Sequence, residues 1–306
     1  MTGLSPSDHQ HQVLADREHF VAEDVEVLLF GQDRTPRIVA AEFRFPGQIL
    51  LYQRTDDGRT LTIEQNLRPW LIARDPEALQ NLRPAPATSS LRGAGTHPLA
   101  TLFEFDSWEH FRRTRDLLPT PTHGVYQINS PVSQFLMRTG VTLFKGMVFE
   151  DLRRLQLDIE TLSLNPKDDH GAIVMIALKQ GDHEELLFLD TDERDLLFRF
   201  SEAIQRLDPD VIEGHNIYNF DLPYLVERAR RWQVTLRLGR DGSPPQLNEQ
   251  QRFRAGPVSL PYTQVHVHGR HIVDTYQQLQ RFDTAGRLSS YALKSAVRAL
   301  GLEREE

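Results

Sequence analysis

The 306-residue sequence predicts an α/β protein (α+β overall) in which a smaller, mostly antiparallel β-rich domain precedes a mixed sheet flanked by helices. The amino-terminal half carries successive short strand patterns separated by Gly, Pro and Asp turns. The carboxy-terminal half begins with three strand patterns in direct succession and then alternates strands with helical patterns. A hydrophobic content of 39% with 25% charged residues is ordinary for a globular protein that buries a core.

The first domain is predicted to span residues 1–149, and its polar, His-rich opening, about residues 1–20, is expected to fray. Residues 82–98 lack periodicity and predict a loop. A further strand at 101–105 and a helix at 108–118 should precede a linker to the second domain. The earlier strand patterns lie at residues 25–30, 37–45, 48–54 and 60–65.

The second domain is predicted to span residues 150–306 and to contain the mixed sheet. Its strand patterns lie at residues 155–160, 172–179, 185–190, 211–215 and 270–275, and its helical patterns at 193–207, 221–232 and 286–300. Residues 235–269, rich in Gly, Pro and Gln, predict a hairpin or loop insert that projects from the sheet. This order of elements is typical of the ribonuclease H-like architecture.

The strand pattern at 155–160 places two acids on one face. Its apolar residues alternate with polar ones, so Asp158 and Glu160 point the same way. Their attachment points should lie about 6 to 7 Å apart, and carboxylates at this spacing can bridge or flank two divalent ions. The alternative is an ordinary strand whose solvated face carries two acids.

A third acid, Asp221, is predicted at a junction between a strand and a helix, because Asp221-Leu222-Pro223 opens a helical pattern. The alternative is a helix N-cap, a position at which Asp is common. Capping does not require the preceding run of Asn216, Asn219 and Phe220. We therefore expect Asp221 to join the other two acids.

Two segments resemble motifs of the 3′→5′ proofreading exonuclease domain of family B DNA polymerases. Asp158-Ile159-Glu160 resembles the first motif, Asp-x-Glu, and Asn216-Ile217-Tyr218-Asn219-Phe220-Asp221 resembles the second, Asn-x2-3-Phe/Tyr-Asp. Residues 271–276 and 288–297 resemble the later strand of the family and the helix after it. The resemblance is specific over about residues 150–300, and residues 130–152 more weakly resemble the link from the polymerase amino-terminal domain.

The sequence departs from the family at the third motif, Tyr-x3-Asp. The residues four positions after Tyr262, Tyr276 and Tyr291 are His266, Gln280 and Ser295. We therefore expect a fragment of a longer protein, or a truncated gene product, that stops before this motif. Such a chain lacks a metal-binding Asp and a Tyr that would help to position the attacking water, and their loss would lower the rate.

The resemblance implies a two-metal site in which Asp158, Glu160 and Asp221 are catalytic and bind Mg²⁺ or Mn²⁺. Asp274 would bind metal weakly or from an outer position, or would instead cap a strand end or helix. The resemblance also implies substrate-binding roles for Thr161, Leu162, Asn216, Asn219 and Phe220.

The function that follows is a metal-dependent 3′→5′ exonuclease of the proofreading type, which removes nucleotides from single-stranded DNA 3′ ends. Its polymerase region would be carboxy-terminal and absent from this chain. One alternative is a catalytically silent nucleic-acid-binding or scaffold fragment of a polymerase-like protein. Another is a protein-interaction domain.

Composition excludes other classes. Because there is no Cys, disulfides, thiolate metal sites and a Cys nucleophile are excluded. No apolar stretch is long enough to span a membrane and no signal peptide is evident, so we expect a cytoplasmic protein without a membrane partner. The net charge of −8 argues against a large phosphate-binding surface. Five arginines predict either solvated charges or a DNA track: Arg228, Arg230, Arg231, Arg237 and Arg240.

Overall fold

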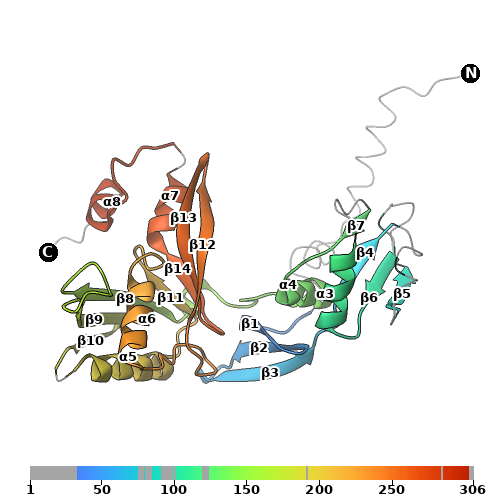
Figure 1. Ribbon diagram of the computed structural model, residues 1–306, viewed down its shortest axis with the longest axis horizontal. Helices are drawn as coiled ribbons and strands as arrows, with labels where there is room; N and C mark the ends of the chain where they lie inside the picture. The colour runs from blue at the N-terminus through green and yellow to red at the C-terminus, as the bar shows by residue number, and fades with distance from the viewer. Residues whose placement is uncertain are drawn as a thin grey trace, which may run out of the picture. The chain divides into compact units, whose positions relative to one another are not determined.

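The structure is a computed structural model that describes residues 33–74, 79, 85–90, 99, 101–118, 124–190, 192–283 and 285–302. The chain divides into two compact units, Met1–Gly146 and Met147–Glu306, where the sequence predicted domains 1–149 and 150–306. Figure 1 shows the described elements of both units. The strand predicted at residues 25–30 lies outside the described residues, as does the polar opening segment.

The first unit contains two antiparallel sheets. One has the order β1-β2-β3 and comprises β1 (Ile38–Arg44), β2 (Gln48–Arg54) and β3 (Thr60–Asn66). The other has the order β5-β6-β4-β7 and comprises β4 (Trp70–Ala73), β5 (Ala87–Ser90), β6 (Thr101–Glu104) and β7 (Val125–Tyr126). The predictions for β1, β2, β3 and β6 are confirmed, with small shifts at the strand ends.

Four described elements of this unit were not predicted, namely β4, β5, β7 and α4. β5 lies within the segment predicted as a loop, and it is a strand because it pairs with β6, with Thr88 opposite Phe103. The segment predicted as a linker contains a helix, α4 (Pro131–Thr139). Ser130 caps this helix by accepting a hydrogen bond from the Ser133 N–H at 3.1 Å, and Pro131 suits the first turn because it needs no backbone donor there.

Aromatic side chains form much of the core of the first unit. The predicted helix is confirmed as α3 (Trp108–Leu117), with Ser107 as its N-cap. Trp108 stacks on Phe111 with ring centroids 4.9 Å apart, and Phe105 meets Phe111 edge-on at 5.6 Å. These rings pack α3 against the buried Phe103 of β6.

The second unit contains a five-stranded mixed sheet, as predicted. Its order is β10-β9-β8-β11-β14, with β8 in the middle. The strands are β8 (Arg154–Thr161), β9 (Ile173–Gln180), β10 (His183–Phe188), β11 (Val211–Gly214) and β14 (His271–Asp274). β9 is antiparallel to both β8 and β10, whereas β11 is parallel to β8 and β14. The sheet is therefore mixed at its centre.

The central strand β8 has the predicted two-residue period. Leu155, Leu157 and Ile159 are buried in the core of the second unit, with exposed fractions of 0%, 3% and 5%. Asp158 and Glu160 lie on the opposite, exposed face of the strand. The hydrophobic side chains thus fix the direction in which both carboxylates point.

Four helices of the second unit are described: α5 (Glu193–Leu207), α6 (Asp221–Arg231), α7 (Thr275–Phe282) and α8 (Leu293–Ala299). The predictions for α5 and α6 are confirmed. The helix predicted at 286–300 is confirmed in its second half as α8 but begins later, and α7 was not predicted. α7 begins directly after β14, and Asp283 ends it by accepting hydrogen bonds from the backbone of Arg287 and Leu288. Gly286, with φ of 63°, keeps the next residues out of a helix. Among the described residues, no helix is long and apolar enough to cross a membrane.

The insert between α6 and β14 is an antiparallel hairpin, which confirms one of the two forms predicted for residues 235–269. It comprises β12 (Gln246–Ala255) and β13 (Val258–His266). The two strands pair from Gln246 opposite His266 to Ala255 opposite Val258. In Figure 1 the hairpin extends from the sheet beside α7.

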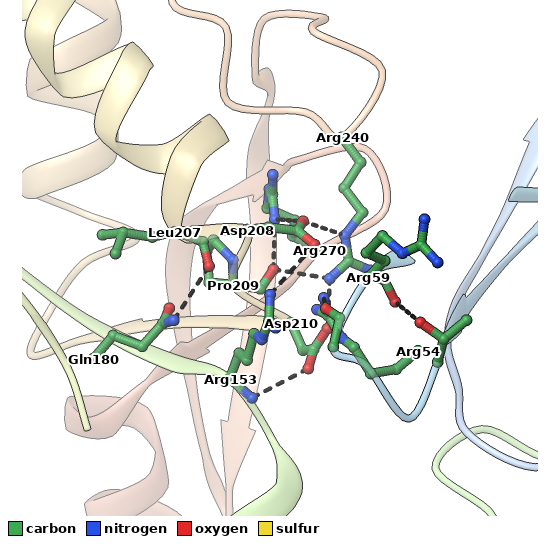
Figure 2. A network of polar contacts seen from close by, with 12 residues as sticks. Arg54, Arg59, Arg153, Gln180, Leu207, Asp208, Pro209, Asp210, Arg240 and Arg270 are labelled. Carbon is green, nitrogen blue, oxygen red and sulfur yellow. Dashed lines mark hydrogen bonds and ion pairs between the residues drawn. The ribbon is translucent and has the colours of Figure 1, made fainter. Parts of the chain in front are cut away.

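A buried ion-pair network ties the start of β11 to the insert and to β14. Figure 2 shows the carboxylates of Asp208 and Asp210 held by the guanidinium groups of Arg240 and Arg270. Asp210 also accepts a hydrogen bond from the Arg153 N–H at 3.1 Å. Burial, and next the charge of Arg240, lowers the pKa of Arg270 to about 10, so Arg270 remains charged at neutral pH. The network therefore joins the start of β11 to the starts of its two neighbouring strands, β8 and β14.

Candidate active site

The edge of β8 that faces β11 is open where its acids lie. β8 pairs with β11 only as far as Gln156, opposite Glu213, whereas its pairing with β9 continues to Thr161. The backbone from Asp158 onward is therefore accessible on that side to the loop that follows β11. This loop leads into α6.

Asp221 is the first residue inside α6, and Phe220 is the N-cap, so the N-cap alternative for Asp221 is wrong. Its side chain is only 2% exposed and crosses to β8, where its Oδ1 accepts a hydrogen bond from the Ile159 N–H at 3.2 Å. Ile159 lies between Asp158 and Glu160. The structure thus places Asp221 at the same segment of β8 as the other two acids.

Two backbone positions allow the loop before α6 to approach β8. At Gly214, the end of β11, an added Cβ would lie 2.9 Å from the Leu157 carbonyl oxygen, so a side chain would clash with the backbone of β8. Asn216 adopts a φ of 69°, a left-handed conformation that Asn tolerates better than most residues. Gly214 and Asn216 both lie in the segment before Asp221, which helix capping alone does not require.

Ionisation of Asp221 and of Asp158 is disfavoured by burial and by the charge of a neighbouring acid. Burial, and next the charge of Asp158, raises the pKa of Asp221 to about 7, although hydrogen bonds from the backbone of Asp221 and Ile159 oppose the shift. Partial desolvation, and next the charge of Glu160, raises the pKa of Asp158. Carboxylates that repel one another in this way attract a cation, because a positive ion between them would favour their charged forms.

The donors fit a hard divalent cation, because carboxylate oxygens are the ligands that Mg²⁺ and Mn²⁺ prefer. Asp158 is the acid that links the other two, because its charge raises the pKa of Asp221 and the charge of Glu160 raises its own. Within the described residues, however, no group of three or more His, Cys, Asp or Glu side chains is arranged to hold a metal ion. The structure therefore brings the predicted ligands to one place without forming a complete three-ligand cage.

Asp274 is the N-cap of α7, which is the second of the two roles that the sequence allowed. It is 1% exposed, and its Oδ1 accepts hydrogen bonds from the N–H groups of Asn216 and Tyr276, both at 2.9 Å. Its Oδ2 accepts a third from the Tyr218 N–H at 3.2 Å. Asp274 thus holds the loop before α6 in place, and its charge is a minor cause of the raised pKa of Asp221.

Comparisons with known proteins agree with this geometry. Residues 179–296 match the family model for the exonuclease domain of DNA polymerase family B. The second unit resembles the exonuclease domain of family B DNA polymerases, and we call it the exonuclease-type unit. The matched range includes Asp221 and the loop before it, and it begins after Asp158 and Glu160.

Relatives of the exonuclease-type unit are archaeal polymerases. The chain is 41% identical over 99 residues to a DNA polymerase of Archaeoglobus fulgidus, covering 32% of this chain and 12% of that protein. It is 30% identical over 188 residues to a DNA polymerase of Pyrococcus glycovorans, covering 58% of this chain and 22% of that protein. The chain therefore spans less than a quarter of the length of these relatives.

A solved structure supports the fold. The family B DNA polymerase from Pyrobaculum calidifontis superposes with a TM-score of 0.66 and 22% identity. The alignment covers 87% of this chain and 39% of that one. Because the identity is low, this likeness concerns the fold, and it extends beyond the exonuclease-type unit to most of the chain.

The predicted substrate residues of the exonuclease-type unit lie at the ends of β8 and β11. Leu162 is 66% exposed, and the Thr161 hydroxyl donates a hydrogen bond to the Ser163 carbonyl at 2.8 Å. Asn219 is exposed and donates to the side chain of Asn216 at 3.3 Å. Phe220 is half-buried and packs against the core. The structure therefore leaves Leu162 and Asn219 the most accessible of the five.

A buried support behind the site was missed by the sequence analysis. Arg228 of α6 is 1% exposed and forms an ion pair with Glu193 of α5 at 2.5 Å. Burial alone would raise the pKa of Glu193. Hydrogen bonds from Arg228, the Ile173 N–H and the Trp232 indole nevertheless hold this pKa below its ordinary value. The prediction of Arg228 as a solvated charge or part of a DNA track is wrong. Its four-residue spacing from the buried Tyr224 was the available signal.

Tyr224 and Arg228 together hold the loop between β8 and β9. The Tyr224 hydroxyl lies 2.8 Å from the carbonyl oxygens of both Ser163 and Gly171. Arg228 donates to the carbonyl oxygens of Pro166 and Asp168 at 3.0 and 3.1 Å. One face of α6 thus orders the loop that follows the first two acids. The helix positions Asp221 at its start and this loop along its length.

The other arginines of the predicted basic cluster are also engaged within the exonuclease-type unit. Arg240 is buried in the network of Figure 2. The exposed side chains of Arg230 and Arg231 contact Glu227 and Asp169, at 3.0 and 2.6 Å. These pairings favour structural and surface roles over a continuous DNA track.

Proposed function

We propose that the second unit is a metal-dependent 3′→5′ exonuclease of the proofreading type that removes nucleotides from DNA 3′ ends. The observation that carries the proposal is the convergence of Asp158 and the buried Asp221 on one segment of β8, where burial, and next the charge of a neighbouring acid, raises the pKa of each carboxyl. The match of residues 179–296 to the exonuclease domain supports it.

Asp158, Glu160 and Asp221 would hold Mg²⁺ or Mn²⁺ in this proposal. Divalent ions supply a metal-activated water and stabilise the charge that develops as a phosphodiester is cleaved. Because the pKa of Asp221 is about 7 without metal, its carboxyl is partly protonated at neutral pH. Cation binding would release that proton, so affinity for the cation should rise with pH.

The substrate would lie across the accessible ends of β8 and β11. The exposed Leu162 offers an apolar surface to a terminal base or sugar, and Asn219 offers an amide that can donate to and accept from a nucleotide. Thr161, Asn216 and Phe220 complete the proposed binding residues. A single-stranded 3′ end suits this site because its bases are free to stack and to form hydrogen bonds.

We also infer a partner region. Since the relatives are named as DNA polymerases, we propose that this unit works together with a carboxy-terminal polymerase region, in the cytoplasm.

The test is Mn²⁺-dependent degradation of 3′-labelled single-stranded DNA by the purified chain. Asp158→Ala/Glu160→Ala should abolish it while leaving the melting profile near that of the wild type, because both side chains lie on the exposed face of β8. Asp182→Ala/Glu184→Ala is a matched control, since it removes the same Asp-x-Glu pair from an exposed turn and strand start. Unchanged cleavage by the first variant would refute the catalytic assignment.

A second candidate function is nucleic-acid binding without turnover. It is favoured by the incomplete metal cage among the described residues. This candidate predicts that single-stranded DNA binds the wild-type chain in Mn²⁺ and in EDTA without being shortened in either. Shortening in Mn²⁺ that EDTA stops would exclude it.

A further inference from the structure

A pocket of about 500 Å³ lies beside the loop that carries the second motif. It is lined by that loop, by the β12–β13 hairpin and by α7, which Figure 1 shows next to each other. Its walls include the aromatic residues Phe253, Tyr262 and Tyr276 and the amides Gln277 and Gln280. Its volume is within the range of pockets that bind small organic ligands.

Two amide side chains of α7, Gln277 and Gln280, line this pocket, and neither forms a hydrogen bond with the part of the chain that the structure describes. Both residues are mostly buried, at 8% and 7% exposed, but their amide atoms do not belong to the fully buried polar atoms that lack a partner in the described part of the chain. The amide groups are therefore accessible from the pocket. Gln278, on the same helix, is exposed. The two pocket amides are therefore placed to bind a ligand.

The remaining walls are largely aromatic. Tyr262 of β13 is supported by Tyr218, with ring centroids 5.3 Å apart, and Tyr276 of α7 meets His215 edge-on at 5.5 Å. At the buried Phe253, Arg281 of α7 lies 5.0 Å from the ring centroid and links α7 to the hairpin. Aromatic walls with amide groups match a flat heterocycle, which stacks through its faces and forms hydrogen bonds through its edge.

The pocket adjoins the candidate active site through His215 and Asn216. The ring nitrogens of His215 lie 3.1 Å from the Thr275 hydroxyl and 2.9 Å from the Tyr291 carbonyl oxygen, so the ring is fixed between α7 and the segment before α8. His215 is also close enough to Asp158 for its charge to lower the pKa of that carboxyl. A DNA strand whose 3′ end reaches Asp158 can therefore extend toward this pocket.

We propose that this pocket binds a nucleobase of the single-stranded DNA substrate, with the base stacked on Tyr262 or Tyr276 and its edge hydrogen-bonded by Gln277 and Gln280. This inference rests on the proposed function and adds a binding site for a nucleotide away from the cleaved bond. Because amides both donate and accept, the pocket can accommodate more than one base.

The experiment measures binding of a fluorescein-labelled 12-nucleotide single strand in EDTA by fluorescence anisotropy. An abasic site is placed at each of the last six positions from the 3′ end in turn. With wild-type protein, one internal position should weaken binding about tenfold, the size expected for loss of one stacked base. Gln277→Leu/Gln280→Leu should weaken binding of the intact strand by a similar factor and remove the penalty of that abasic site. Gln278→Leu should bind as the wild type does.

Stability distinguishes a ligand site from a structural one. If the two amides serve only the ligand, Gln277→Leu/Gln280→Leu should melt close to the wild-type temperature, because the change removes no hydrogen bond of the described fold. Competition with deoxynucleoside monophosphates, in a further arm, separates a base on a strand from a free nucleotide. Displacement of the strand at low millimolar concentration from the wild type, but not from the variant, would assign the pocket to the free nucleotide and overturn its assignment to the strand.

Wild-type affinity and a persisting abasic penalty in Gln277→Leu/Gln280→Leu would overturn the proposal. Because the assay is performed in EDTA, it does not depend on cleavage. A variant that binds normally while the wild type digests DNA refutes this pocket alone. A position-specific penalty without digestion refutes the nuclease assignment alone.

Discussion

Two buried carboxylates of the second unit, Glu193 and Asp221, lie in opposite electrostatic surroundings. Glu193 is held by Arg228, by the Trp232 indole and by the Ile173 N–H, which together keep its pKa low. Asp221 receives backbone hydrogen bonds but faces Asp158, and its pKa rises to about 7. Glu193 and Asp221 are buried to nearly the same extent, with exposed fractions of 3% and 2%.

The difference separates a structural acid from a candidate functional one. A carboxylate that only supports the fold is supplied with a cation and with donors by its own chain, as Glu193 is. The charged side chains that act on Asp221 are those of Asp158 and Asp274, and both of these acids raise its pKa. Perturbed acids of this kind are common where a protein binds a metal or performs chemistry.

The strongest way to break the comparison is to remove the cation from Glu193. Arg228→Met should lower the free energy of unfolding by about 3 to 5 kcal/mol, because it leaves a buried carboxylate without its partner. Chemical denaturation measures the loss. The exposed Arg230, which pairs with Glu227, is the matched control on the same helix, and Arg230→Met should cost less than about 1 kcal/mol. Equal losses in the two variants would show that the buried pair has no special role.

A smaller effect should appear as a pH dependence of stability caused by Asp221. Its pKa is about 7 in the folded chain and 3.8 for the ordinary carboxyl, so the unfolded chain ionises first as the pH rises. Stability from this group is fully present below about pH 4 and is lost as the pH rises toward 7. Asp221→Asn should remove this loss, which is on the order of 2 to 4 kcal/mol in EDTA.

The measurement is urea denaturation of the wild type and of Asp221→Asn at a series of pH values from 4 to 8. The advantage of the variant should grow up to about pH 7 and then level off. Asp182→Asn, in an exposed turn, should run parallel to the wild type at every pH. A constant difference between Asp221→Asn and the wild type would mean that Asp221 does not titrate in this range.

Local sequence pattern was sufficient to predict the parts of the fold that depend on it. The alternation of Leu155, Leu157 and Ile159 located β8 and the direction of its acids. The strand-to-helix junction at Asp221 and the hairpin insert were predicted as well. β4, β5, β7, α4 and α7 were missed. Of these, β5 depends on pairing with β6, and α4 is a short helix within an apparent linker.

The site was predicted less completely because it depends on contacts between distant residues. Arg228 and Glu193 lie 35 positions apart in the sequence, and a charge on a helix gives no sign by itself that it is buried. The hydrogen bonds that Asp274 accepts from the loop before α6 likewise join segments more than fifty residues apart. The motif spacing indicated the acids but not the side chains that hold them.

The most direct test of the central claim, that Asp158 and Asp221 jointly attract a divalent cation, is the Mn²⁺-dependent increase in unfolding temperature relative to EDTA. At a Mn²⁺ concentration one hundred times the dissociation constant, the free energy of unfolding of the wild type should rise by about 2.7 kcal/mol, and its unfolding temperature should rise with it. The unfolding temperature of Asp158→Asn/Asp221→Asn should hardly change with Mn²⁺, and that of Asp182→Asn should rise as much as that of the wild type. An equal Mn²⁺-dependent increase in the double variant and the wild type, or none in the wild type, would contradict the claim.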